Sequence, residues 1–272
     1  MTNLLSNKKG IIIGVANDRS ICWDIAKQIC QNGARVVLGY TDLTADRVKK
    51  LADDFNINYT SSMTSYKCDV SSDDSINSFF DFVKSIFGNI DFIVCAPAFT
   101  NKENLKGEYM KISRADFLQT MDVSVYALTA ICNTFSSILN DNGSILTLSY
   151  YGAEKIVKNY NVMGVAKSAL EASVRYLAND FGIRGIRANS ISAGAVKTLA
   201  SSAIGGFRDI MKYGENISPL RRNITTEDIS KTALFLLSDL SSGITAENIY
   251  VDCGLNAVGL AIDTQEKGVN NE

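Results

Sequence analysis

The sequence contains no histidine and only two prolines, Pro97 and Pro219, among its 272 residues. The lack of histidine excludes Ser-His-Asp hydrolysis, histidine acid–base catalysis and most transition-metal sites. No apolar run approaches the roughly 20 residues of a membrane-spanning helix, and no long apolar stretch precedes a small-residue cleavage site near the N-terminus. The formal net charge of −2 gives no general attraction to nucleic acid or membranes. We therefore expect a cytoplasmic protein that binds neither.

The cysteines have mostly apolar neighbours, and none forms a CxxC pair. The six are Cys22, Cys30, Cys68, Cys95, Cys132 and Cys253. We expect buried, reduced thiols, because isolated cysteines in apolar surroundings behave as small hydrophobic side chains. Disulfides or a metal site remain the alternative.

Short apolar runs alternate with longer helical patterns along the chain. Continuous apolar runs are typical of strands in a parallel sheet covered by helices on both faces. Seven such strands are predicted, at 10–15, 34–40, 65–70, 91–96, 143–149, 186–192 and 248–252. Helices are predicted at 20–32, 43–54, 73–86, 113–138, 159–182 and 226–238, with Asp73 and Thr226 as N-caps. The pattern indicates an α/β fold: one doubly wound Rossmann-type domain over residues 1–272, with a loose tail at about 261–272.

One segment interrupts this alternation. Residues 194–224 contain several glycines and are helical only in part. They follow the sixth strand at the carboxyl edge of the sheet, where ligands bind in such folds. We expect a flap over a substrate, and a fixed surface insertion is the alternative.

Tyr160 and Lys167 are the most informative pair of side chains. In the expected helix their spacing places both on one face, about 10 Å apart along the axis. A phenol can donate a proton or a hydrogen bond, and an ammonium can hold a sugar hydroxyl and strengthen the phenol as an acid. Gly164, between them, leaves room for a ligand against the helix backbone. The pair suggests reduction chemistry with a bound nucleotide.

The first predicted strand leads into a candidate nucleotide loop. Gly14 allows a tight turn, and Ser20 can cap the next helix or donate to a phosphate oxygen. The usual G-x-G-x-x-G is absent, so an ordinary strand–helix turn explains this stretch almost as well. Thr41 follows the second strand, where an adenosine ribose is recognised. No Arg or Lys accompanies Thr41 there to bind a 2′-phosphate, which favours NADH over NADPH.

Two more strand ends add candidate contacts. Asp69, after the third strand, could accept a hydrogen bond from an adenine amino group or cap the next helix. Small residues end the fourth strand, where a ligand can pass close to the backbone. There we expect Ala96 at the cofactor and Ala98 at the substrate.

Several stretches together resemble the short-chain dehydrogenase/reductase superfamily. More narrowly, they resemble the bacterial NADH-dependent enoyl-acyl-carrier-protein reductases of type II fatty acid synthesis. The resemblance covers about residues 7 to 260 and is most specific at 148–154, 159–167 and 189–194, with further matches at 197–200 and 238–245. Carbonyl- and alcohol-converting members carry Y-x-x-x-K on the long helix, whereas Met163 occupies that tyrosine position here. A Y-x-x-x-K at Tyr151 and Lys155 precedes the helix and is interpreted as a chance match.

The resemblance implies roles for the matched residues. Tyr160 would hydrogen-bond the thioester carbonyl, Lys167 would bind the nicotinamide ribose, and Tyr150 would be a second active-site tyrosine. Cofactor contacts would come from Gly14, Ser20, Ile21, Asp69, Val70, Val196 and Thr198. Ala200 through Phe207, including Ile204, would belong to the flap, with the acyl chain against Ile204, Phe207, Ile210 and Met211.

The function implied by the resemblance is reduction of a trans-2-enoyl thioester by hydride transfer from NADH. The partner would be acyl carrier protein, and the assembly a homotetramer. The acidic carrier could meet a basic group made of Lys197, Arg208, Lys212, Arg221 and Arg222. A carbonyl-reducing relative, such as a 3-oxoacyl-carrier-protein reductase, and a non-catalytic NAD-sensing protein are the alternatives.

Overall fold

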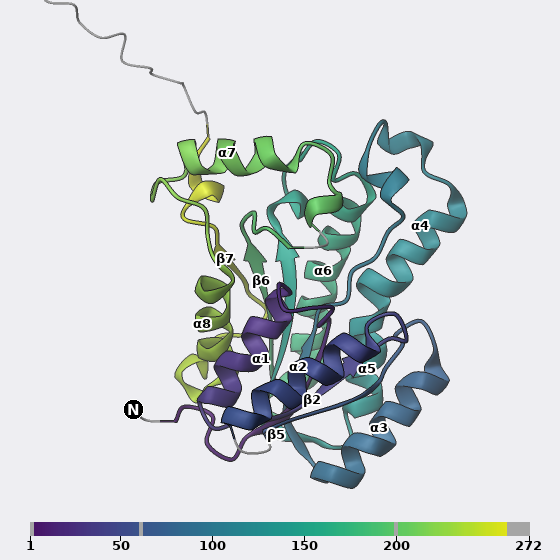
Figure 1. Cartoon of the computed structure of the whole chain (residues 1–272), viewed down its shortest axis with the longest axis vertical. Coiled ribbons are helices and arrows are strands. Elements are labelled where there is room, and N and C mark those ends of the chain that lie inside the picture. The colour runs from purple at the N-terminus through teal and green to yellow at the C-terminus, as the bar shows by residue number, and fades with distance from the viewer. Residues whose placement is uncertain (1–2, 60–61, 199–200, 260–272) are drawn as a thin grey trace, which may run out of the picture.

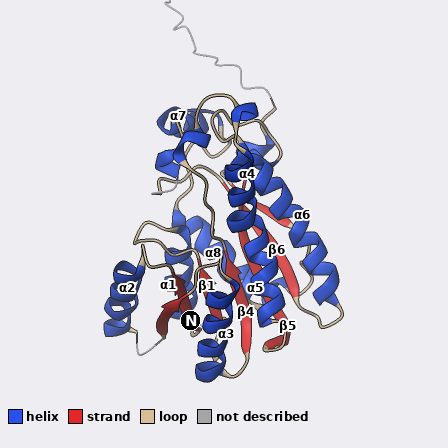
Figure 2. Cartoon of the chain, turned by 90° about the vertical axis from the view of Figure 1, so that its right-hand side faces the viewer, coloured by secondary structure: helices blue, strands red, loops and turns tan. Residues whose placement is uncertain are grey.

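The computed structural model describes residues 3–59, 62–198 and 201–259. Seven parallel strands form a sheet in the order β3-β2-β1-β4-β5-β6-β7, seen in red in Figure 2. They are β1 (Lys9–Ile13), β2 (Arg35–Tyr40), β3 (Met63–Lys67), β4 (Ile90–Cys95), β5 (Leu139–Tyr150), β6 (Arg187–Ala193) and β7 (Asn248–Val251). The predicted strands and their parallel, doubly wound arrangement are confirmed, although β5 begins earlier than predicted.

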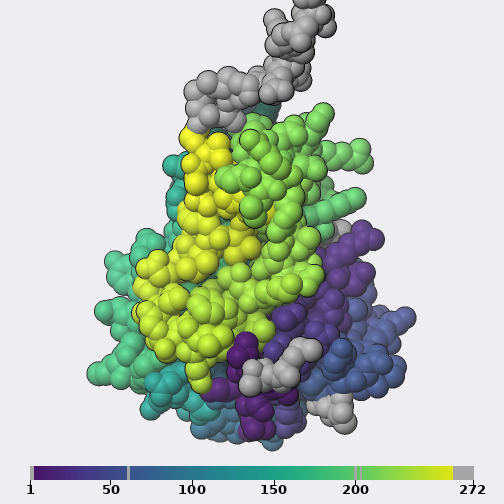
Figure 3. Space-filling view, turned by 90° about the vertical axis from the view of Figure 1, so that its left-hand side faces the viewer, coloured from purple at the N-terminus to yellow at the C-terminus, as the bar shows by residue number. Residues whose placement is uncertain are grey.

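Helices cover both faces of the sheet because neighbouring strand residues point to opposite sides. Ile12 and Leu38 pack against one set of helices, and Ile11 and Val37 pack against the other. The first face is covered by α1 (Ile21–Gln31), α2 (Ala45–Asn58) and α8 (Thr226–Leu237). The second is covered by α3 (Asp73–Phe87), α5 (Ala127–Phe135) and α6 (Val162–Gly182). The helices α1 and α8 pack against each other on the first face. In Figure 3 the yellow-green residues of α8 lie beside the purple residues of α1.

The two predicted N-caps are each wrong by one residue. Ser72 caps α3, and its side chain accepts from the backbone N–H of Ser75. Thr225 caps α8 in a capping box with Asp228. A hydroxyl in extended backbone reaches the free N–H groups of the first turn, whereas Asp73 and Thr226 already have helical backbone and occupy the first helical position.

The long helix predicted at 113–138 is divided into three parts. It consists of α4 (Arg114–Met121), a π-helical turn η3 (Asp122–Tyr126) and α5. The π turn inserts an extra residue into the helical ladder, a feature frequent at functional sites. It directs Ser124 toward the loop that follows β4.

The segment 194–224 contains the one long helix that the sequence left unplaced, α7 (Phe207–Ile217). Figure 1 shows α7, in green, lying above the carboxyl ends of the central strands. The remaining elements are short 3-10 turns: η1 (Lys102–Leu105), η2 (Tyr109–Lys111), η4 (Tyr151–Ala153), η5 (Ser201–Ala203), η6 (Asp239–Ser241) and η7 (Leu255–Ala257).

The six cysteines are buried and free of disulfides, as expected. Within the described ranges, no group of three or more His, Cys, Asp or Glu side chains could hold a metal ion. In the same part of the chain, no helix combines the length and apolar character needed to cross a membrane.

Candidate active site

A cavity of 610 Å³ opens at the carboxyl edge of the sheet, below α7. It brings together segments that are far apart in the sequence, because the carboxyl ends of parallel strands meet at one edge. Its lining includes ten predicted site residues: Ile21, Ala96, Ala98, Tyr150, Tyr160, Lys167, Val196, Thr198, Ile204 and Phe207.

The other predicted cofactor residues do not line this cavity. Gly14 and Ser20 lie in the turn from β1 to α1, and Thr41, Asp69 and Val70 lie beyond β2 and β3. Their distribution follows the strand order from β1 toward the β3 edge of the sheet, so they form a path leading away from the cavity. Ala200, the remaining predicted substrate contact, lies outside the described residues.

Tyr160 precedes α6, so the prediction that it shares one helical face with Lys167 is wrong. Asn159 and Asn161 have φ values of 67° and 45°, and regular helix begins only at Val162. Asparagine tolerates this left-handed region better than most residues. The irregular turn presents the phenol to the cavity while its ring packs with Leu105 and Met163.

The Tyr160 side chain is largely buried, with 8% of its surface exposed. Its ring meets that of Tyr150 edge to face, with centroids 4.9 Å apart and planes at 71°. Burial raises the pKa of Tyr160 far above the usual tyrosine value, and the neighbouring Tyr150 adds to this effect. Tyr160 is therefore a neutral hydrogen-bond donor at physiological pH.

Glycines shape the space around the Tyr160 ring. A Cβ at Gly152 would lie 2.5 Å from Tyr160 Cδ1, which no real contact allows. A Cβ at Gly164 would lie 2.7 Å from the Gly152 carbonyl oxygen. The room at Gly164 is thus filled by the protein's own backbone, not by a ligand as the sequence suggested.

Lys167 carries a buried ammonium on α6, with 6% of the residue exposed. Its Nζ donates to the Leu148 carbonyl oxygen at 2.8 Å. Within the described residues, Nζ has no other hydrogen-bond acceptor. Because an ammonium has three N–H donors, Lys167 can still donate hydrogen bonds to oxygen atoms of a ligand in the cavity. Burial lowers the pKa of Lys167 to about 8, while the nearby Cys22 and Glu171 act in the opposite direction.

Glu171 lies one helical turn beyond Lys167 and is also buried. The Ser149 hydroxyl donates a short hydrogen bond to Glu171 Oε1, and Asn248 Nδ2 donates to the same oxygen at 3.1 Å. Burial raises the pKa of the Glu171 carboxyl, while the bond from Ser149 opposes that rise. This network joins β5, α6 and β7 behind Lys167, and sequence reasoning missed it because its members are far apart in the chain.

The turn from β1 to α1 is tight and closely packed. Gly14 has a φ of 124°, and a Cβ there would lie 3.0 Å from the Ala96 carbonyl oxygen. The Ser20 hydroxyl accepts from the backbone N–H groups of Ala16 and Asn17, each at 3.0 Å, and makes no capping bond to α1. The first N–H groups of α1 therefore stay available to an anion at the helix N-terminus.

The loop after β4 supplies cavity residues that the sequence did not single out. Phe99, Thr100 and Leu105 line the cavity together with Met163. The loop is held by the helical segment 114–135, because Phe99 N–H donates to Ser124 Oγ at 3.0 Å and Thr120 Oγ1 donates to Thr100 Oγ1 at 2.8 Å. In the sequence this contact is marked by no more than the polar side chains of Thr100, Thr120 and Ser124, because the π turn is seen in the structure alone.

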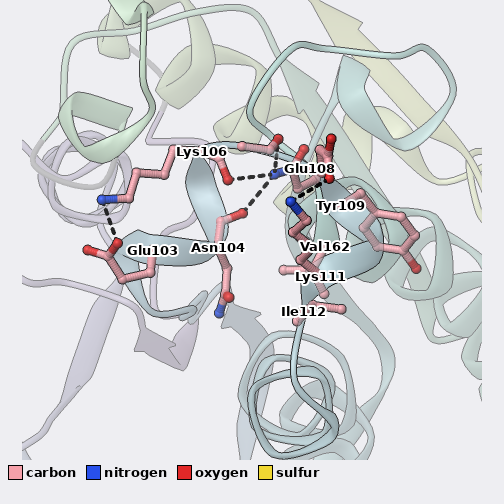
Figure 4. A pocket seen from close by; sticks show the side chains of 10 residues that line it. Glu103, Asn104, Lys106, Glu108, Tyr109, Lys111, Ile112 and Val162 are labelled. Carbon is pink, nitrogen blue, oxygen red and sulfur yellow. Dashed lines mark hydrogen bonds and ion pairs between the residues drawn. The ribbon is translucent and has the colours of Figure 1, made fainter.

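A second cavity, of 540 Å³, lies outside the first and is shown in Figure 4. Its lining includes four charged side chains and comes from residues within 103–112 together with Asn161 and Val162. Asn161 Nδ2 donates to the Asn104 carbonyl oxygen at 3.0 Å, and the ion pairs Lys106–Glu103 and Lys111–Glu108 cross its rim. The hydrogen bond from Asn161 ties the 103–112 segment to the start of α6, whereas the two ion pairs stay within the segment.

The fold and the site together define a class of protein: an oxidoreductase of Rossmann type, whose carboxyl-edge cavity holds a tyrosine and a buried lysine. The predicted cofactor contacts outside this cavity are called the nucleotide path below. A family model described as enoyl-(acyl carrier protein) reductase matches residues 14–256. The chain belongs to this family of enoyl-acyl-carrier-protein reductases within the short-chain dehydrogenases/reductases.

Named relatives and solved structures agree with this membership. An NADH enoyl-acyl-carrier-protein reductase of Rhizobium meliloti (strain 1021) is 48% identical over 270 residues, covering 98% of this chain and 97% of the relative. The Anaplasma phagocytophilum reductase, solved in complex with NAD, is 45% identical with a TM-score of 0.88 and 96% coverage of both chains. The Bacillus cereus reductase, solved with NADP+ and indole naphthyridinone, is 43% identical with a TM-score of 0.91, covering 94% of this chain and 99% of that one.

Proposed function

We propose that this protein reduces trans-2-enoyl-acyl-carrier-protein thioesters to acyl thioesters with NADH, the final reductive step of type II fatty acid elongation. The observation that carries the proposal is the pairing of a neutral, buried Tyr160 phenol with a buried Lys167 ammonium on one 610 Å³ cavity at the carboxyl edge of the sheet. Family membership supplies the reaction class, and the side chains supply the chemistry.

The residues present suit a nicotinamide dinucleotide. A pyrophosphate can approach the backbone at the turn of Gly14, where the side chain of Ala96 is also small. The N-terminus of α1 supplies free N–H groups for its oxygen atoms. Lys167 has spare donors for the hydroxyls of the nicotinamide ribose, and Val196 and Thr198 lie on the same cavity. When bound, the cofactor supplies the hydride for the β-carbon of the enoyl thioester.

Tyr160 stabilises the charge that develops on the thioester carbonyl oxygen. A neutral donor held in place before the reaction binds this developing oxyanion more strongly than the uncharged carbonyl. The Lys167 ammonium lines the same cavity, where its positive charge favours negative charge on the phenol oxygen. It would also hold the ribose, which fixes the geometry of hydride transfer. Tyr150, in ring contact with Tyr160, limits the positions that the phenol can take.

The segment 194–224 would act as the flap over the acyl chain. Ile204 and Phe207 line the cavity from this segment, and Asn159 Nδ2 donates to the Gly205 carbonyl oxygen at 2.8 Å. That hydrogen bond links the flap to the turn carrying Tyr160. A substrate that displaces the flap would therefore also act on the position of the phenol.

Two assemblies follow from this proposal. The carrier protein would dock on the outer side of the flap segment, where the exposed Arg208, Lys212 and Arg221 can meet an acidic partner. A homotetramer is supported by large exposed apolar side chains on α4, η3 and α6, including Leu118, Tyr126 and Tyr176 at 60%, 54% and 75% exposure. Light scattering on the purified chain measures the assembly directly.

The decisive experiment compares two thioesters under identical conditions. Purified protein and NADH are mixed with crotonyl thioester or with acetoacetyl thioester, and NADH absorbance is followed. The proposal requires consumption with the crotonyl compound. Consumption with the acetoacetyl compound alone would identify a carbonyl reductase, and consumption with neither would identify a nucleotide-binding protein without this activity.

A further inference from the structure

Lys67 and Asp42 form an ion pair at the adenosine end of the nucleotide path, with Nζ and Oδ2 2.6 Å apart. Lys67 is the last residue of β3, and Asp42 lies two positions beyond the end of β2. The sheet register places Lys67 beside Tyr40, so the two charges meet although they are 25 positions apart. The residues next to Thr41 in the sequence include no cation, but the fold places Lys67 there from the neighbouring strand β3.

The location of this pair matters because Rossmann-type proteins read the adenosine ribose directly after the second strand. The turn that presents Asp42 is fixed: Thr44 N–H donates to the Thr41 carbonyl oxygen at 2.9 Å, and Thr41 N–H donates to Thr44 Oγ1 at 3.1 Å. NADPH differs from NADH there by a 2′-phosphate with about two negative charges. Such a group requires a cation and is repelled by a carboxylate.

We propose that the Asp42–Lys67 ion pair sets the preference of this enzyme for NADH over NADPH, because Asp42 pairs with the Lys67 ammonium, which would otherwise bind a 2′-phosphate. This inference rests on the proposed function in one respect, the use of a nicotinamide dinucleotide. The uncharged 2′-hydroxyl of NADH is compatible with the pair and can donate to the free oxygen of Asp42.

The surrounding charges are consistent with this role. Asp69 adds negative potential at Lys67, and the hydrogen bond that Lys67 donates to Asp42 is the main cause of the raised pKa of the Lys67 ammonium. Lys49 lies over the Tyr40 ring, 5.2 Å from its centroid, and Arg47 Nη2 donates to the Leu43 carbonyl oxygen at 3.1 Å. These two cations have their own partners, so Lys67 is the cation that removal of Asp42 would release.

The test measures dissociation constants of NADH and NADPH without substrate, by nucleotide fluorescence, for four proteins and one control variant. These are the wild type, Asp42→Asn, Lys67→Gln and the double variant. Asp42→Asn is expected to lower the NADPH dissociation constant roughly tenfold. The freed Lys67 ammonium would attract the doubly charged 2′-phosphate, and in exposed surroundings that attraction corresponds to a change of about this size. NADH binding should change less than about threefold, since its ribose carries no charge at this position.

The double variant decides whether Lys67 is the acting group. The gain in NADPH affinity should disappear when Lys67→Gln is added, and Lys67→Gln alone should leave NADPH binding weak. Asp54→Asn, an exposed site farther along α2, is the matched control for net charge and should change neither constant. The variants are expected to fold, because an exposed ion pair contributes little to stability.

Three results would overturn the inference. They are unchanged NADPH affinity in Asp42→Asn, a gain that survives in the double variant, and a wild type that binds NADPH as tightly as NADH. The last result would leave the reductase function intact. A wild type that binds neither nucleotide would instead contradict the proposed function itself.

Discussion

The rings of Tyr150 and Tyr160 meet edge to face at 4.9 Å, although one tyrosine ends a strand and the other lies in an irregular turn before a helix. Aromatic rings prefer this arrangement, because the positive edge of one ring faces the negative face of the other. The contact orients the Tyr160 phenol within the cavity, so the two tyrosines should respond differently to loss of their hydroxyls.

Tyr160→Phe keeps the ring contact and removes the donor to the developing oxyanion. A hydrogen bond to a charged group contributes about 1.5–3 kcal/mol, so turnover should fall roughly 10- to 100-fold. The NADH dissociation constant should stay within about twofold, because the phenol does not hold the ribose. Steady-state kinetics with crotonyl thioester and fluorescence titration with NADH measure the two quantities. Unchanged turnover would remove Tyr160 from the proposed chemistry.

The pH dependence of NADH binding should report the Lys167 ammonium. Burial lowers the pKa of Lys167 to about 8, so the free protein loses this charge as the pH rises through that value. If the charged form holds the ribose, the NADH dissociation constant should rise above pH 8, approaching about tenfold per pH unit. Lys167→Met should bind NADH more weakly and without this dependence. A wild-type constant that stays flat from pH 7 to 9.5 would contradict the assignment.

The same shift sets the sign of a stability effect. An unfolded lysine has a pKa of about 10.4, so between pH 8 and that value the unfolded chain binds more protons than the folded one. The free energy of unfolding should therefore gain a contribution from Lys167 that increases with pH across this window. Urea unfolding at pH 7.5 and 9.5, compared between wild type and Lys167→Met, isolates that contribution.

Gly152→Ala should damage catalysis by moving the Tyr160 ring. The new methyl group would lie 2.5 Å from Tyr160 Cδ1 and 3.2 Å from Tyr150 Cδ1, so the rings must shift to admit it. A misplacement of about 1 Å can cost roughly 100-fold in rate. Gly182→Ala is the matched control, because nothing lies within 4 Å of a Cβ at that end of α6. Equal turnover in the two variants would show that the glycine is not required for the site.

Phe207→Asp should weaken substrate binding if the segment 194–224 covers the acyl chain. Phe207 lines the cavity, whereas Tyr213 on the same helix is 57% exposed. A carboxylate in place of the ring would lose the free energy of apolar burial against the acyl chain, about 1.5–3 kcal/mol. The KM for a long-chain enoyl thioester should therefore rise roughly 10-fold or more. Tyr213→Asp should leave KM near the wild-type value. If both variants match the wild type, the segment is a surface insertion.

Local pattern was sufficient to predict the sheet and most of the helices. Strands such as β1 and β4 are buried on both faces, and that burial requires an unbroken apolar run, which is visible in the sequence. The class of the protein followed from matched stretches that contain Tyr160 and Lys167. Errors appeared where one residue decides a boundary, as at Ser72 and Thr225, because several neighbouring side chains there can cap a helix.

The sequence by itself determined the order of the elements, the burial of the cysteines and the residue types available for chemistry. Only the tertiary structure decided that Tyr160 leaves the helix, that Glu171 joins Ser149 and Asn248, and that Lys67 meets Asp42. Burial patterns repeat with the period of a strand or helix and can be read locally. Contacts between separate strand ends depend on sheet order and register, which arise only when the whole chain packs.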